Sequence, residues 1–195
     1  MKKIFAALII GIITLSVSAQ EHLKIKGVLI DGSVNSFITK MKAAGLTYNS
    51  NISSIVGYPV LDGDFAGLSN CHFTILHTKN KTVCKVLITS DDIGGWYSTK
   101  SKYEDLKELL STKYEIVKSF EYFSSPYYEG DGYELLAIKQ DKGTYKTFFH
   151  CDEGYVTLTL SASDTSSGYL SIVYEDTINM AKFSEERDKQ ISEDI

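Results

Sequence analysis

The fold is decided by two short stretches in the middle of the chain. They read Cys-His-Phe-Thr-Ile-Leu-His (71–77) and Val-Cys-Lys-Val-Leu-Ile-Thr (83–89), and the polar segment 79–81 lies between them. Apolar and polar residues alternate along both stretches, which is typical of strands that bury one face. We therefore expect an antiparallel hairpin with a tight turn at 79–81. Its buried face is expected to match two residues of the first strand with two of the second, namely Phe73 and Ile75 with Val86 and Ile88.

The register of this hairpin also bears on the cysteines, of which the chain has three. In the expected register Cys71 and Cys84 lie several positions apart along the ladder, at about 3.4 Å per residue, which is too far for a disulfide. An odd number leaves at least one thiol unpaired within the chain. We interpret Cys71 and Cys84 as small buried side chains, and a disulfide from either of them to Cys151 stays open.

Outward from the hairpin, each half of the chain contains one helical pattern. The first half has a strand-like segment at 23–30 and then an apolar stripe with helical spacing, formed by Val34, Phe37, Ile38 and Met41. The second half predicts a helix over 98–113, with a stripe formed by Tyr103, Leu106, Leu109 and Leu110. Short extended pieces are expected between 52 and 65. Further strands are expected at 114–123, 133–140, 144–151, 155–162 and 168–175.

These patterns predict an α+β fold in which antiparallel sheets are each covered by a helix and leave their other face free. The repeated order suggests two tandem similar modules, residues 20–95 and 96–178, followed by a charged C-terminal tail or helix over 179–195. Residues 73–92 can be aligned with 145–164 without a gap. Their sequence identity is poor, so a true duplication stays open.

The N-terminus predicts export from the cytoplasm. Lys2 and Lys3 precede an uncharged apolar run over 4–15, and small residues follow at 17–19. The run has about a dozen residues, whereas a membrane-spanning helix needs about 20. We interpret residues 1–19 as a cleavable signal peptide. The mature protein is expected to be periplasmic or secreted, with no membrane anchor after signal cleavage.

The remaining chain of about 176 residues is long enough for one compact domain or two small ones. Loss of Lys2 and Lys3 changes the formal net charge from −5 to −7. Nucleic-acid-binding proteins need a basic patch or stripe, and the sequence shows none, so nucleic acid is not expected as a partner. The sequence does not indicate the oligomeric state.

Two segments carry a resemblance to known proteins: Leu-Lys-Ile-Lys-Gly-Val-Leu-Ile-Asp-Gly-Ser-Val-Asn-Ser-Phe (23–37) and Lys-Ala-Ala-Gly-Leu (42–46). They resemble the start of a set of secreted proteins from Bacteroidetes-type bacteria, most of them described as hypothetical. The signal ending Ser-Ala-Gln (18–20) and the segment Gly-Asp-Phe-Ala-Gly (63–67) resemble the same set.

The order of elements is similar to the tandem modules of β-lactamase-inhibitor-protein-like folds. It is also similar to the small lipoproteins of outer-membrane assembly, although their lipidation cysteine is missing here. The resemblance implies a periplasmic or secreted protein that acts by binding, and it brings no catalytic residues.

Several short patterns resemble chemical sites but lack essential parts. Asp62-Gly63-Asp64 begins like a calcium loop, yet Ala66 and Phe73 occupy two positions that need oxygen ligands. Neighbouring Cys and His residues, as in 71–72 and 150–151, leave a strand on opposite faces and do not share a zinc ion. The sequence contains no nucleophile elbow and no phosphate loop. We therefore predict no catalytic residues, no metal and no cofactor.

The sequence is rich in tyrosine, with 13 of 195 residues. In the strand expected at 114–123, Phe120 and Tyr122 share one face and Phe123 takes the other. Tyrosine is favoured at binding surfaces because it joins an apolar ring to a polar tip, although burial inside the sheet is the alternative. The candidate binding surface consists of Trp96, Tyr97, Tyr122, Tyr127, Tyr128 and Tyr133.

The sequence thus favours a non-enzymatic periplasmic or secreted binding protein whose partner is another secreted or envelope protein. An inhibitor or immunity protein is a narrower form of this hypothesis. A glycan-binding or small-ligand-binding protein is the alternative. An unrecognised hydrolase is less favoured, because it would need a pocket that converges on a Cys-His or Asp-Asp pair.

Overall fold

The computed structural model describes residues 21–193, and the predicted signal peptide lies outside them. The first half contains β1 (Lys24–Ile25), β2 (Val28–Leu29), α1 (Val34–Ala43), β3 (Thr47–Tyr48), α2 (Ser50–Val56), β4 (Val60–Phe65), β5 (Leu68–His77) and β6 (Val83–Thr89). The second half contains α3 (Trp96–Ser111), β7 (Glu115–Phe123), α4 (Glu134–Lys139), β8 (Gly143–Cys151), β9 (Gly154–Ala162), β10 (Gly168–Asp176) and α5 (Thr177–Glu193).

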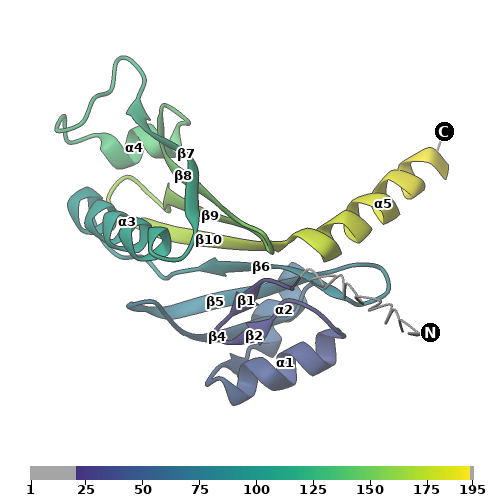
Figure 1. Cartoon of the computed structure of the whole chain (residues 1–195). Helices are drawn as coiled ribbons and strands as arrows, with labels where there is room; N and C mark the ends of the chain where they lie inside the picture. Colours follow the sequence, from purple (N-terminus) through teal and green to yellow (C-terminus); the bar gives the residue numbers. More distant parts are fainter. Residues whose placement is uncertain (1–20, 194–195) are drawn as a thin grey trace, which may run out of the picture.

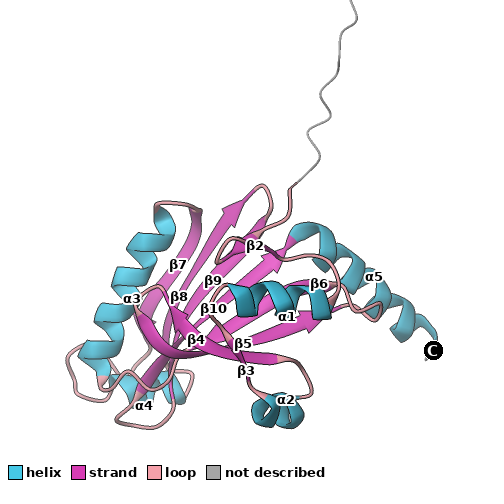
Figure 2. Ribbon diagram, turned by 90° about the horizontal axis from the view of Figure 1, so that it is seen from below, coloured by secondary structure: helices cyan, strands magenta, loops and turns pink. Residues whose placement is uncertain are grey.

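Most strands belong to one antiparallel sheet (Figure 2). Its eight strands pair in the order β3-β4-β5-β6-β10-β9-β8-β7, while β1 and β2 form a separate two-stranded sheet. This confirms the predicted α+β class with antiparallel pairing. The predicted hairpin is present as β5 and β6, and Phe73 lies opposite Ile88 as expected.

The two halves contribute to this one sheet instead of forming a sheet each. β6 and β10, the last strands of the halves, pair at its centre, where Ile88 lies opposite Ile172. Each half runs through the same series, which is a helix, a strand, a short helix and three strands. By this order β5–β6 corresponds to β9–β10, whereas the gapless sequence alignment matches it with β8–β9. That alignment therefore pairs strands at different places in the sheet, and the duplication stays a prediction.

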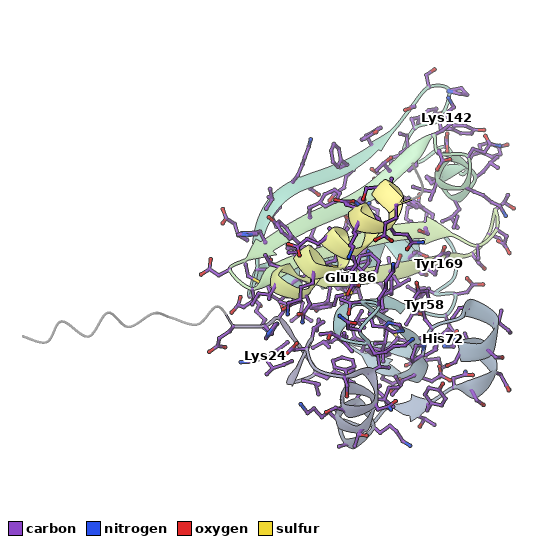
Figure 3. The ribbon with its side chains drawn as sticks, turned by 90° about the vertical axis from the view of Figure 1, so that its right-hand side faces the viewer. Lys24, Tyr58, His72, Lys142, Tyr169 and Glu186 are labelled. Atoms are coloured by element: carbon purple, nitrogen blue, oxygen red, sulfur yellow. The ribbon has the colours of Figure 1, made fainter. Side chains whose placement is uncertain are left out.

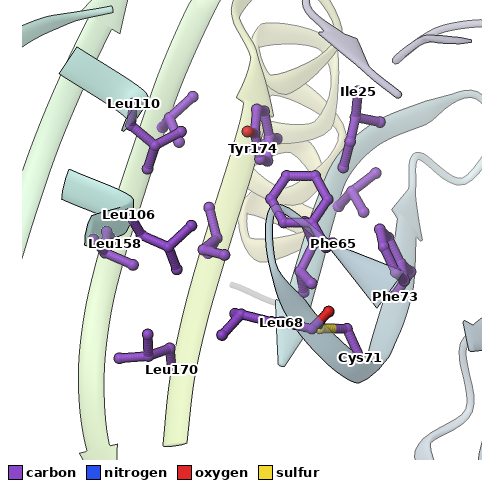
Figure 4. Packing of buried hydrophobic residues seen from close by; sticks show 14 of the residues in the cluster. Ile25, Phe65, Leu68, Cys71, Phe73, Leu106, Leu110, Leu158, Leu170 and Tyr174 are labelled. Carbon is purple, nitrogen blue, oxygen red and sulfur yellow. Dashed lines mark hydrogen bonds between the residues drawn. The ribbon is translucent and has the colours of Figure 1, made fainter. Parts of the chain in front are cut away.

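One face of the sheet carries the core. α1, α3 and α4 pack on it through buried side chains such as Phe37, Tyr103 and Leu135. Figure 4 shows Leu106 and Leu110 of α3 facing the strands of the sheet. Along β8, β9 and β10 buried residues alternate with partly exposed ones, because successive side chains point to opposite faces. The second face of the sheet is therefore not covered by these helices.

The sheet is bent, as Figure 1 shows. β7 and β8 rise from the level of β5 and β6, with α1 and α3 on the outside of the bend. The inside of the bend is the face without covering helices. α5 projects from the end of β10, and the inside of the bend lies between α5 on one side and β7 and β8 on the other. No helix within residues 21–193 is long and apolar enough to cross a membrane.

Two short helices were not expected. The segment 133–140, predicted as a strand, contains α4 instead, because it consists of good helix formers and its Leu135 and Ile138, three residues apart, both reach the core. α2 replaces an extended piece near Ile52. The Asn49 side chain caps its first turn, and Gly57, with φ 76°, ends it in the left-handed conformation.

Candidate binding surface

The face inside the bend, called the free face below, is crossed by rows of side chains that the strand register aligns. One row consists of Thr74, Leu87, Val173, Thr157 and Phe148. The next consists of His72, Thr89, Ser171, Thr159 and Lys146. Between β6 and β9 these two rows carry short hydroxyl-bearing and aliphatic side chains, and their aromatic side chain and lysine stand on β8. A third row places Lys85, Glu175 and Tyr155 on the same face.

Four of these long side chains form what we call the Lys–Phe cluster: Lys118, Phe120, Lys146 and Phe148. Lys118 lies opposite Phe148, and Phe120 lies opposite Lys146. The two rings meet edge to face with their centroids 6.2 Å apart. Lys118 Nζ lies 4.5 Å from the Phe120 centroid, and Lys146 Nζ lies 4.9 Å from the Phe148 centroid. These cation–π contacts hold both lysines over the sheet surface.

The two lysines of the cluster differ from Lys85 and His72 of the free face, which both have a carboxylate partner. Lys85 is paired with Glu175 at 2.7 Å, and His72 Nδ1 lies 2.8 Å from a carboxylate oxygen of Asp62. Neither Lys118 nor Lys146 has a carboxylate within 4.0 Å among residues 21–193. The β7–β8 end therefore presents two uncompensated positive charges on aromatic surface, in a protein whose net charge is negative.

β7 is also the end strand of the sheet, so its outer edge has no neighbouring strand. Its side chains are unusually open, with Val117 63% and Tyr122 50% exposed. A bulge between Ile116 and Lys118 interrupts the pairing with β8, and the register is regular from there to the end of the strand. An edge of this kind offers unpaired backbone N–H and C=O groups to another strand. At the opposite end of the sheet, β3 is only two residues long.

The structure separates the residues of the predicted aromatic surface. Trp96 is only 5% exposed and packs against Phe123 and Tyr145, with ring centroids 5.4 and 4.9 Å away. It belongs to the core and is removed from the candidate surface. Tyr97 is 74% exposed on the first turn of α3, away from the free face. Tyr122 lies on the free face beside the Lys–Phe cluster.

The other three tyrosines follow the end of β7. Tyr127 is partly buried, and its hydroxyl donates to Gln140 Oε1 at 2.9 Å. Tyr128 and Tyr133 are 66% and 60% exposed, and their backbone N–H groups donate to the carboxylate of Asp131. These two rings extend the exposed aromatic surface beyond the strand end. They do not join the Lys–Phe cluster.

Sequence reasoning found one half of the cluster and missed the other. The alternation within one strand places Phe120 and Tyr122 on the same face, as predicted. Lys146 and Phe148 join them only through the β7–β8 register. The alternation of 144–151 was visible in the sequence, so a trial pairing of the two strands was the signal that could have found them.

The cysteines show no features of a catalytic site. All three are free thiols, which answers the open question of a disulfide with Cys151. Burial raises the pKa of Cys71 and of Cys84 to about 11, so both stay protonated at neutral pH. Among residues 21–193 no group of three or more His, Cys, Asp or Glu side chains could hold a metal ion.

A second feature is an open cleft of about 570 Å³ between the start of α1, helix α2 and the β5–β6 turn. Tyr48 and Tyr58 line it together with several serines, His77 and Lys81. The ring of Tyr58 meets His77 edge to face at 5.8 Å. Figure 3 shows Tyr58 on the side of the molecule from which α5 projects. No carboxylate lines this cleft.

Comparisons with models of known protein families, with characterised proteins and with solved structures gave no match. The resemblance to secreted Bacteroidetes-type proteins and to β-lactamase-inhibitor-protein-like modules therefore stays a prediction from the sequence.

Proposed function

We propose that this protein is a non-enzymatic periplasmic or secreted binding protein that recognises another protein through the free face of its sheet. The observation that carries the proposal is the Lys–Phe cluster. A broad sheet surface ends there in two aromatic rings that meet edge to face and two lysines without carboxylate partners. Exposed aromatic side chains are enriched at protein interfaces.

A site-specific photocrosslinker tests the proposal in the cells that produce the protein. Benzoylphenylalanine in place of Thr157 stands in the middle of the free face. In place of Ile55, which is 82% exposed on α2, it serves as the matched control. We expect one discrete crosslinked protein from position 157 and none from position 55. No crosslink from position 157, or the same products from both positions, would refute the proposal.

The identity of the trapped protein separates two forms of the proposal. If it is an enzyme whose activity falls when purified protein is added, the narrower form, an inhibitor or immunity protein, applies. If its activity is unchanged, the protein acts by binding alone. N-terminal sequencing of the mature chain checks the export part, for which we expect a start near Gln20.

The cleft beside α2 favours a second candidate, the binding of a glycan or another small polar ligand. Two tyrosine rings and nearby hydroxyl groups are suited to the apolar face and the hydroxyls of a sugar. A thermal-shift screen with neutral and acidic oligosaccharides tests it, because a saturating ligand raises the melting temperature. The shift should be absent in Tyr58→Ala and kept in Tyr97→Ala, which alters an exposed ring elsewhere. A screen without any shift rejects this candidate.

A further inference from the structure

The outer edge of β7 is suited to receive one more strand. Within β7 the register with β8 is regular from Lys118 to Phe123, and β8 is the only element with which β7 makes extensive contact in the described chain. The backbone groups that point away from β8 over this stretch therefore have no strand to pair with. A strand added here gains main-chain hydrogen bonds, as in other cases of β-augmentation.

The side chains of this stretch set the charge that an added strand meets. Its carboxylate, Glu121, faces away from the free face. It accepts hydrogen bonds from Ser119 and Lys107, and the hydroxyl of Tyr103 lies 3.4 Å away. That negative charge is already compensated within the protein. On the free face the charge of Lys118 is not compensated, so the edge presents net positive charge to an approaching strand.

We propose that the free edge of β7 binds an extended acidic segment of the partner protein, which adds to the sheet and places a carboxylate opposite Lys118. This inference rests on the proposed function and adds the chemistry of the partner. Residues directly opposite each other in neighbouring strands lie about 5 Å apart, which lets a glutamate or aspartate reach Lys118 Nζ. Two residues along, the segment places a side chain opposite Phe120, where an apolar residue continues the aromatic surface.

A second copy of this chain fits the same edge less well. If two β7 strands pair in antiparallel fashion about Phe120, Lys118 lies opposite Tyr122 and Ser119 lies opposite Glu121. Lys118 of each copy then remains without a carboxylate partner. In this register the charge of the edge favours a different, acidic segment over self-association.

The test uses a fluorescein-labelled peptide in which glutamate alternates with valine, so that the carboxylates of the extended peptide share one face. Fluorescence anisotropy should show binding that weakens with salt, and replacement of glutamate by glutamine should weaken it by about tenfold or more. N-methylation of alternate backbone amides keeps the carboxylates but blocks strand pairing, and this peptide should lose binding. Lys118→Glu should lower the affinity by about tenfold or more, and Lys118→Gln by less.

Lys40→Glu is the matched control, because Lys40 is exposed on α1 outside the bend, and it should leave binding unchanged. Far-UV circular dichroism of each variant establishes that it is folded. The inference is wrong if no peptide binds below about 1 mM. It is also wrong if the N-methylated or glutamine peptide binds equally well, or if Lys118→Glu has no effect.

A dimer in sedimentation equilibrium that Lys118→Glu dissociates would overturn the inference in favour of self-association. The photocrosslink from position 157 does not depend on the β7 edge. A partner trapped there, together with a negative peptide test, would therefore retain the proposed function and reject only this inference.

Discussion

Asp176 ties the N-terminal segment to the end of the central strand β10. Its side chain is fully buried and accepts hydrogen bonds from the backbone N–H groups of Leu23 and Asn179, both at 2.9 Å. The ring Nδ1 of His22 lies 3.0 Å from it. One carboxylate thus caps the first turn of α5 and anchors the segment that enters β1. Removal of a buried carboxylate that accepts several hydrogen bonds destabilises the folded protein strongly, because the donors stay buried without an acceptor.

Replacement of Asp176 by alanine is expected to lower the free energy of unfolding by about 3 kcal/mol. Urea unfolding, followed by far-UV circular dichroism, measures the change. Asp105→Ala removes an exposed carboxylate from α3 and should change the stability by less than about 0.5 kcal/mol. Equal effects of the two substitutions would contradict the role assigned to Asp176.

Glu121 illustrates a carboxylate whose ionisation depends on the fold. Partial burial opposes its charge, but hydrogen bonds from Lys107 and Ser119 outweigh this and hold its pKa below the ordinary value of 4.5. A carboxylate with a lowered pKa in the folded state stabilises the protein above its unfolded pKa. That stabilisation is lost as the pH falls through the folded pKa.

Glu121→Gln should therefore destabilise the protein at pH 7, by up to about 1 kcal/mol because the group is partly exposed. Near pH 3 the difference between wild type and variant should be smaller, because the wild-type carboxylate loses charge as the pH falls toward its lowered folded pKa. Urea midpoints at the two pH values measure it. A stability difference between wild type and variant that grows on acidification would show that folding does not lower the pKa of Glu121.

At the scale of elements, the β8–β9 turn depends on close approach to β10. Gly154 lies opposite Asp176, and a Cβ on this glycine would lie 2.1 Å from the carbonyl oxygen of Glu175. Since that oxygen belongs to the backbone of a central strand, the strand itself would have to move.

Gly154→Ala is accordingly expected to lower the free energy of unfolding by about 2 kcal/mol or more. Gly95→Ala is the matched control. Its Cβ would meet the nearest atom at an ordinary 3.9 Å, so only a change of up to about 1 kcal/mol at the α3 N-cap is expected. Thermal unfolding of both variants distinguishes them, and a Gly154→Ala protein as stable as wild type would exclude the steric argument.

The elements that sequence alone predicted are those with a long, clear period. The alternation of 71–77 and 83–89 gave the register of β5 and β6. α2 and α4 were not predicted, because their seven and six residues are too few to show a helical period. Trp96 was predicted to be part of the aromatic binding surface, at the junction of the two predicted modules, and the helix was predicted to begin at Ser98. The real α3 begins at Trp96 itself and turns the ring into the core.

The candidate surface, too, could be predicted from the sequence only in part. That Phe120 and Tyr122 share a face follows from one strand alone. Their contact with Lys146 and Phe148 depends on which strand pairs with β7 and on the bulge after Ile116, neither of which a local pattern specifies. Pairing between distant strands was the information that the sequence lacked.

For the whole molecule, the shared sheet implies that the two halves unfold together, although each repeats the same series of elements. At the junction Ile88 and Ile172 face each other, both fully buried. Independent modules would bury their cores separately, whereas here one apolar cluster runs from α1 through the central strands to α3. A substitution that removes packing in the first half should therefore also lower the stability of the second half.

The single tryptophan provides the measurement, because Trp96 lies in the second half and reports its unfolding by fluorescence. Ile75→Ala empties a fully buried site in β5, in the first half, and should lower the free energy of unfolding by about 3 kcal/mol. If the sheet unfolds as one unit, the urea midpoint from Trp96 fluorescence moves by the same amount as that from far-UV circular dichroism. Ile55→Ala, at an 82% exposed site in the same half, should move neither. A Trp96 midpoint that stays in place while the circular dichroism transition splits would mean that the halves are separate modules joined only at their edges.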